Sequence, residues 1–130
     1  MVRKINKYSN PFLKAKGPLP APVAAPNGAA IPNLHEAVAL HQQGMLDQAS
    51  AIYRKLLKFE PQNADALHLL GLIAYQTGSL QESVLLISEA IEINPNDANF
   101  YSNRASALIG LKQFEDAIFN CNQAISLKND

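Results

Sequence analysis

The sequence predicts an all-α protein in which three two-helix repeats stack behind a disordered N-terminal tail. The main observation is that three stretches superimpose at a spacing of 34 residues, with large and small apolar residues at fixed offsets. Composition adds that 130 residues, 48% of them hydrophobic and with no run of ~18 apolar residues, fit one domain at most. The aligned columns are Gly44, Gly78 and Lys112; Leu46, Leu80 and Phe114; Ala49, Ser83 and Ala117; Tyr53, Ile87 and Cys121; Leu56, Ala90 and Ala124; and Pro61 and Pro95.

Residues 1–32 are predicted to form a disordered, basic tail that is rich in proline and alanine. The tail contains the run GPLPAPVAAPNGAA, and proline both fixes φ and removes a backbone donor, so neither helix nor sheet is sustained. Residues 1–35 carry five basic residues and no acidic one. We expect a mobile tether, because five charges over this length are dilute. A basic arm that docks on an acidic partner or a membrane surface remains the alternative.

Helices are predicted at residues 34–43, 46–59, 64–77, 80–93, 98–111 and 114–127, inside an array over 33–130 with repeats at about 30–63, 64–97 and 98–130. Asn33 precedes the first helix and Glu36 follows three residues later, as in a capping box. Asn63 and Asp97 share one repeat column, each two residues after a proline, and each is expected to cap the next helix.

The turn inside each repeat is predicted at the glycine column. Gly44 and Gly78 stand where a residue with free φ ends a first helix, and Lys112 replaces glycine in the third repeat. Within a repeat, small residues are expected to let the two helices approach while large ones fill the space between them. These small residues are Gly71, Ala90, Ala105 and Ala124.

The last predicted helix carries apolar residues that nothing later in the sequence covers. Repeat arrays bury their apolar ends by adding repeats or a polar capping helix. We therefore expect either the opening piece of a longer protein or an end that another chain covers, with self-association through this helix as a consequence. The residues concerned are Phe114, Ile118, Phe119, Ile125 and Leu127.

The sequence contains no pattern that predicts catalysis. It has no nucleotide-binding glycine loop, no HExxH and no cysteine pair, and its three histidines have no metal-ligand spacing. We expect no enzyme activity, cofactor or metal. Cys121 falls in a packing column and is predicted to be a small buried hydrophobe. It cannot form an internal disulfide, which fits a reducing, cytoplasmic location.

Charge and hydropathy also limit the partners. Residues 36–130 carry six basic and eleven acidic residues, so the repeat body is a poor match for phosphate backbones and no nucleic-acid partner is expected. No membrane segment or secretory h-region is predicted either.

These columns resemble the tetratricopeptide repeat, over about residues 30–130. The resemblance implies a right-handed superhelical stack whose first helices line a concave groove that holds a peptide or partner helix. It therefore implies a non-catalytic protein-interaction scaffold. Leu72 and Tyr75 could instead pack against the neighbouring repeat. Carried over by column, the groove residues are Leu34, Val38, His41, His68, Leu72, Tyr75, Asn99, Ser102, Asn103 and Ser106.

A narrower pattern, YSNR at Tyr101–Arg104, is similar to repeats that clamp a C-terminal carboxylate in chaperones. Asn103 matches an asparagine of that clamp. His68 and Leu72 stand where the clamp has a lysine and an asparagine, so its charge-assisted hydrogen bonds would be missing. The resemblance therefore favours an apolar or amphipathic ligand over a carboxylate.

Residues 63–98 are also similar to bacterial arrays that precede domains like those of O-linked N-acetylglucosamine transferases. In those proteins the array presents substrate to catalytic residues further along the chain. The alternative function is therefore the substrate-presenting region of a larger transferase whose catalytic domain is absent from these residues.

Overall fold

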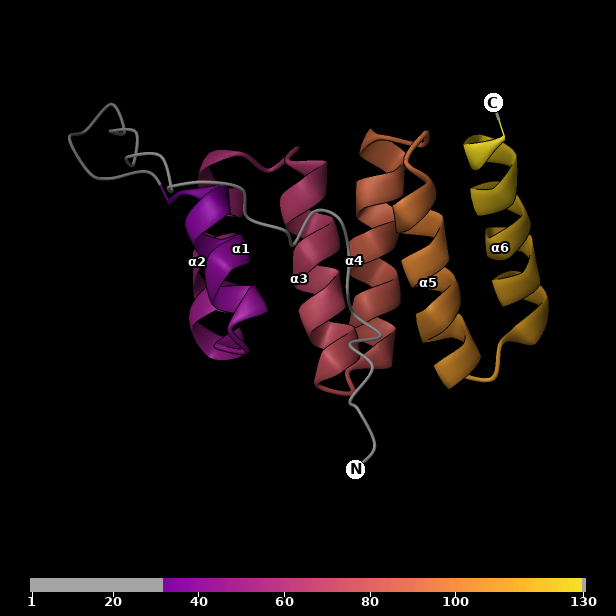
Figure 1. Cartoon of the computed structure of the whole chain (residues 1–130), viewed down its shortest axis with the longest axis horizontal. Helices are drawn as coiled ribbons and strands as arrows, with labels where there is room; N and C mark the ends of the chain where they lie inside the picture. The colour runs from indigo at the N-terminus through magenta and orange to yellow at the C-terminus, as the bar shows by residue number, and fades with distance from the viewer. Residues whose placement is uncertain (1–31, 130) are drawn as a thin grey trace.

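A computed structural model describes residues 32–129 of the chain as six α-helices without strands (Figure 1). This confirms the all-α prediction; each helix begins at the predicted residue and ends within one residue of the predicted end. Residues 1–31 of the predicted tail, 1–32, lie outside the described part, and the domain boundaries stay a prediction. The helices are α1 (Leu34–Gln42), α2 (Leu46–Phe59), α3 (Ala64–Gln76), α4 (Leu80–Ile93), α5 (Ala98–Gly110) and α6 (Phe114–Lys128).

Side chains at three helix starts confirm the predicted caps. The Asn33 side chain accepts from the His35 N–H at 2.8 Å at the start of α1. Asn63 accepts from the Ala66 N–H, and Asp97 accepts from the Asn99 N–H, both at 2.9 Å. Each cap satisfies a backbone donor that the first turn of a helix leaves without an intrahelical partner.

The turns inside the three repeats share one conformation. Gly44 and Gly78 have φ values of 80° and 87°, and Lys112 adopts the same left-handed region at 62°. In each turn the next amide donates back to a carbonyl five residues earlier, for example Gln113 N–H to Leu108 O at 2.9 Å. This is the Schellman arrangement that ends a helix. Lys112 therefore holds the glycine position at a backbone cost that glycine avoids.

The core runs through the stack because the middle repeat is contacted on both sides. Nine consecutive residues of α3, 66–74, are buried, as expected for a helix that is apolar almost all round. Gly71 allows α4 to come close: a Cβ at that position would lie 2.7 Å from Ile87 Cγ1. The small residues Ala90, Ala105 and Ala124 are also buried. The predicted role of small residues in close helix approach is confirmed at Gly71.

Successive helices pack in chain order, and α6 packs against α5 at one end of the stack (Figure 1). Leu127 is partly buried against the core, while Phe114, Ile118, Phe119 and Ile125 are 56–61% exposed. The expectation of an uncovered last helix is confirmed for the described residues. No helix within residues 32–129 combines the length and apolar character needed to span a bilayer.

The prediction that Cys121 is buried was wrong, because its side chain is exposed. The equivalent residues Tyr53 and Ile87 are fully buried, since α3 and α5 pack over α2 and α4. The same column becomes core only where another helix follows, and within the described residues none packs over α6.

Candidate functional site

The ten residues predicted to line the groove divide into two groups. All ten residues lie on the first helix of a repeat, which is α1, α3 or α5. Four of them belong to the interior and offer little surface to a partner: Val38, His41, His68 and Leu72, each at most 5% exposed. The other six are half-buried: Leu34, Tyr75, Asn99, Ser102, Asn103 and Ser106.

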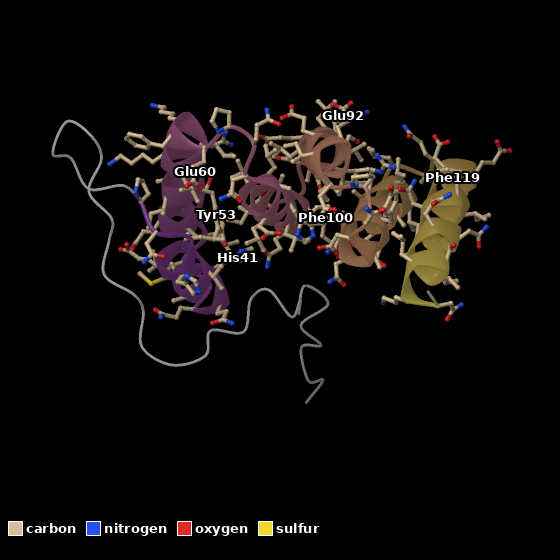
Figure 2. All side chains as sticks on the ribbon, turned by 90° about the horizontal axis from the view of Figure 1, so that it is seen from above. His41, Tyr53, Glu60, Glu92, Phe100 and Phe119 are labelled. Atoms are coloured by element: carbon tan, nitrogen blue, oxygen red, sulfur yellow. The ribbon has the colours of Figure 1, made fainter. Side chains whose placement is uncertain are left out.

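His41 joins repeat one to repeat two by hydrogen bonds. Its Nε2 donates to Gln76 Oε1 at 2.5 Å, and the Tyr53 hydroxyl donates to its Nδ1 at 3.3 Å (Figure 2). Burial lowers the pKa of His41, although the hydrogen bond to Gln76 acts in the opposite direction. The neutral imidazole thus bridges α1, α2 and α3. These partners hold the ring in the interior, where it is 4% exposed, and its predicted place in the groove stays a prediction.

His68 links repeat two to repeat three in a similar way. Asn103 Nδ2 donates to its Nε2 at 2.7 Å, and the Phe100 ring lies 4.6 Å away between centroids. Burial, with a smaller effect from His41, lowers the pKa of His68 to about 3. Both histidine links join residues 35 positions apart. The two histidines occupy different repeat columns, but each of them connects one first helix to the next.

A pocket of about 280 Å³ lies between α5 and α6 and contains two of the predicted groove residues. Ser102 and Ser106 line its α5 side, and the Ser106 hydroxyl donates to the Ser102 carbonyl at 3.3 Å. The α6 side contributes apolar groups and the Lys128 ammonium. The sequence predicted that Ile125 is uncovered but placed Cys121 in the core, so it did not identify this wall. The lining is Ser102, Ala105, Ser106, Ile109, Cys121, Ala124, Ile125 and Lys128.

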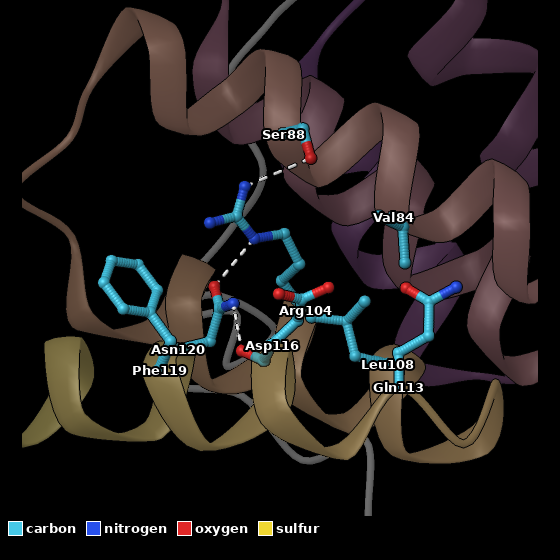
Figure 3. A pocket seen from close by; sticks show the side chains of 8 residues that line it. All are labelled: Val84, Ser88, Arg104, Leu108, Gln113, Asp116, Phe119 and Asn120. Carbon is cyan, nitrogen blue, oxygen red and sulfur yellow. Dashed lines mark hydrogen bonds between the residues drawn. The ribbon is translucent and has the colours of Figure 1, made fainter.

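A second cavity, of about 350 Å³, lies among α4, α5 and α6 around Arg104 (Figure 3). Arg104 Nε donates to Asn120 Oδ1 at 2.7 Å and its Nη1 donates to Ser88 Oγ at 3.1 Å. Its carbon Cζ also lies 5.7 Å from the centre of the Tyr101 ring. Burial lowers the pKa of Arg104, while Tyr101 and Asp116 act against that shift. Arg104 thus ties three helices together.

The signal for this tie was present in the sequence. Arg104 occupies the column in which repeat two has the buried Leu70, and a charged residue at a position that is buried in the neighbouring repeat needs polar partners. Repeats one and two are joined by a different cation, because Arg54 of α2 pairs with Glu82 of α4 at 3.1 Å. The exposed location of this pair makes its contribution to stability small.

The described residues contain no group of three or more His, Cys, Asp and Glu side chains placed to hold a metal ion. The first helices present half-buried amide, hydroxyl and aromatic groups. Such groups orient a bound chain through hydrogen bonds and apolar contact.

Models of known protein families match three overlapping parts of the chain. A model described as TPR repeat matches residues 37–78, and two described as tetratricopeptide repeat match residues 64–97 and 86–119. The match at 64–97 has the bounds that the sequence predicts for the second repeat.

Known proteins are similar over part of their length. The chain is 35% identical over 66 residues to the inactive TPR repeat-containing thioredoxin TTL3 of Arabidopsis thaliana, which is 51% of this chain and 10% of that protein. It is 36% identical over 69 residues to a Hsp70-Hsp90 organising protein of Plasmodium falciparum, or 53% of this chain and 27% of that one. The chain thus spans about a quarter or less of the length of these relatives.

Among solved structures, a mutant O-GlcNAc transferase of Thermobaculum terrenum matches with a TM-score of 0.72 and 27% identity. The match covers 75% of this chain and 19% of that one. The three family models together cover residues 37–119, and the solved structure shares the fold over 75% of this chain. The chain belongs to the tetratricopeptide repeat family.

Proposed function

We propose that this chain is a non-catalytic scaffold that binds a peptide or a partner helix on the face formed by α1, α3 and α5. One observation carries the proposal: the first helices of all three repeats, α1, α3 and α5, each contribute half-buried side chains to the predicted groove residues. Membership of the repeat family and the similarity to a Hsp70-Hsp90 organising protein support a protein partner. The residues proposed for contact are Leu34, Tyr75, Asn99, Ser102, Asn103 and Ser106.

The chemistry of these six residues favours an apolar or amphipathic ligand. None is a lysine or arginine, and the two positions that a carboxylate clamp would use on α3 are the buried His68 and Leu72. A ligand carboxylate would therefore lack charge-assisted hydrogen bonds there. Tyr75 offers a large amphipathic ring, the kind of group that dominates binding energy at interfaces.

Binding of two labelled peptides would test the proposal. One peptide is a designed amphipathic helix with leucines at helical spacing, and the other is an acidic peptide that ends in a free carboxylate. We expect modest affinity for the first, because a short face buries little area and must order its ligand. Tyr75→Ala should weaken that binding by ~1–3 kcal/mol, the scale of an interface hot spot.

Leu85→Ala is the matched control, because Leu85 is 65% exposed on the second helix α4. It should leave peptide binding unchanged, and circular dichroism should show both variants folded. Binding of neither peptide, or an equal loss in both variants, would refute the proposed face. Tight binding of the acidic peptide that survives Tyr75→Ala would instead support the carboxylate clamp.

A second candidate is an array that presents substrate to a transferase domain. The similarity to the O-GlcNAc transferase, at 27% identity over 75% of this chain, favours it. The reading frame beyond Asp130 tests this candidate: a transferase domain encoded there would support it, and a stop codon would exclude it.

A further inference from the structure

Four side chains form an exposed apolar stripe on one face of α6. They follow one another at intervals of four, three and four residues, which places them on one side of a helix over about 16 Å. The same columns in α2 and α4 are covered by the next helix, so Tyr53 and Ile87 are fully buried while Cys121 is exposed. The α6 stripe is Phe114, Ile118, Cys121 and Ile125.

The exposed face of α1, at the other end of the stack, is not complementary to the apolar α6 stripe. The faces of α3 and α5 that pack over α2 and α4 carry residues such as Leu69, Ile73 and Phe100, which are buried. On α1 the columns equivalent to the buried Leu69 and Leu70 hold His35 and Glu36, both of them exposed and polar. Head-to-tail stacking of α6 on the α1 of another copy would desolvate these groups without partners.

The α6 stripe is complementary to itself when two copies run antiparallel. Phe114, which is 56% exposed, projects at its N-terminal end, and the pocket between α5 and α6 opens beside Cys121, Ile125 and Lys128 near its C-terminal end. A two-fold axis through the middle of the stripe places each phenyl ring opposite the pocket of the other copy. Parallel pairing would instead place Phe114 against Phe114 and leave both pockets unfilled.

Charge along α6 favours the same orientation. Its first turn carries Glu115 and Asp116, and its last turn carries Lys128. Antiparallel pairing brings the acidic turn of one copy toward Lys128 of the other and opposes the two helix dipoles.

From the stripe, the pocket and the charge pattern, we propose that the occupant of the α6 stripe is a second copy of this chain. Two copies pair through antiparallel α6 helices, and Phe114 of each enters the pocket between α5 and α6 of the other. This interface goes beyond the proposed peptide-binding face and overlaps it only at Ser102 and Ser106. The dimer therefore closes that end of the face and leaves Leu34, Tyr75 and Asn99 accessible.

Sedimentation equilibrium of the full chain over a range of concentrations tests the pairing. We expect a reversible monomer–dimer equilibrium, and Phe114→Ala should weaken it by about tenfold or more. Phe119→Ala is the matched control, since Phe119 is also 56% exposed on α6 but lines the Arg104 cavity instead (Figure 3). A monomer at every concentration, larger species that grow without limit, or equal weakening by both variants would overturn the proposal.

Thiol cross-linking tests the orientation. In the antiparallel pair the two copies of Cys121, the single cysteine, lie near the centre of the contact, so a short bis-maleimide should join them. In a Cys121→Ser background, Lys128→Cys should give no cross-linked dimer, because the two positions lie at opposite ends of the interface. Cross-linking through position 128, or none through Cys121, would refute the antiparallel arrangement.

Discussion

His41 and His68 act at the residue scale as neutral hydrogen-bonding links between successive first helices. Each ring is buried in a mostly apolar interior, where an uncharged imidazole with a polar partner costs little and a charged one costs much. The orientation at His68 strengthens this preference, because Asn103 donates to Nε2 and would face another N–H if the ring were protonated. These links therefore make the stability of the stack sensitive to acid.

Replacement of His68 should flatten the pH dependence of stability. Its pKa is about 3 in the folded chain against 6.5 as the ordinary value, so the unfolded chain binds more protons between these limits. The stabilisation is present in full above pH 6.5 and is lost as the pH falls. Below about pH 6, His68 alone contributes a slope of up to about 1.4 kcal/mol per pH unit. Urea unfolding of His68→Gln between pH 7 and 5 should show a shallower slope than the native sequence.

His35→Gln is the control for this measurement, because His35 is exposed on α1 and its side chain stays in water. It should leave the slope of the native protein unchanged. If His68→Gln also kept the native slope, the acid sensitivity would have to come from other groups.

At the scale of elements, two glycines lie at helix contacts that should respond differently to an added side chain. Gly71 lies inside α3, and an added Cβ would meet Ile87 Cγ1, an atom near the base of a fully buried side chain. Gly110 lies at the end of α5, and an added Cβ would meet Leu80 Cδ1, the tip of a flexible side chain. Both approaches are 2.7 Å, so the mobility of the neighbour decides the outcome.

Gly71→Ala should destabilise the protein by about 1–3 kcal/mol, because overpacking pushes α3 away from α4 or displaces Ile87. Gly110→Ala should be neutral or stabilising, since Leu80 can move and alanine favours the helix by about 1 kcal/mol. Chemical denaturation of the two variants measures both changes. A stable Gly71→Ala protein would show that the α3–α4 contact is looser than its geometry indicates.

The sequence predicted the helices, caps and turns because each depends on local chemistry that recurs every 34 residues. Asn63, Asp97 and the glycine column are examples in which one residue type indicates one backbone conformation. The burial of the candidate site residues could not be predicted in this way. Repeat columns place His41 and His68 on first helices, but whether a side chain reaches solvent depends on partners in the next repeat. The prediction for Cys121 was wrong because residues in its column are buried only where a following helix covers them.

For the whole molecule, the support that each repeat receives differs along the stack. The middle repeat is contacted on both sides, whereas α6 packs on α5 and exposes its stripe. In a repeat array, stability is close to a sum of repeat terms and nearest-neighbour interfaces, so a repeat with one neighbour opens at lower free energy. We therefore expect the third repeat to open before the second.

Amide hydrogen exchange of the Phe114→Ala variant, which removes the proposed α6 pairing, would test this order. Amides of α6 should exchange about tenfold or more faster than those at the centre of α3, through opening that leaves α3 intact. A polar helix appended after α6 should raise the protection of α6 and the melting temperature. Equal protection of α3 and α6 would show that the stack unfolds as a single unit.

The contrast between the polar columns of α1 and the apolar stripe of α6 also gives the array a direction of growth. A duplicated repeat placed after α6 meets a surface that already has the shape and polarity of an internal junction. The same unit placed before α1 would bury His35 and Glu36, which are suited to water, and would need compensating substitutions before it could fold. We therefore expect repeat duplication to be tolerated more readily after α6 than before α1, because only the second change buries polar groups without partners.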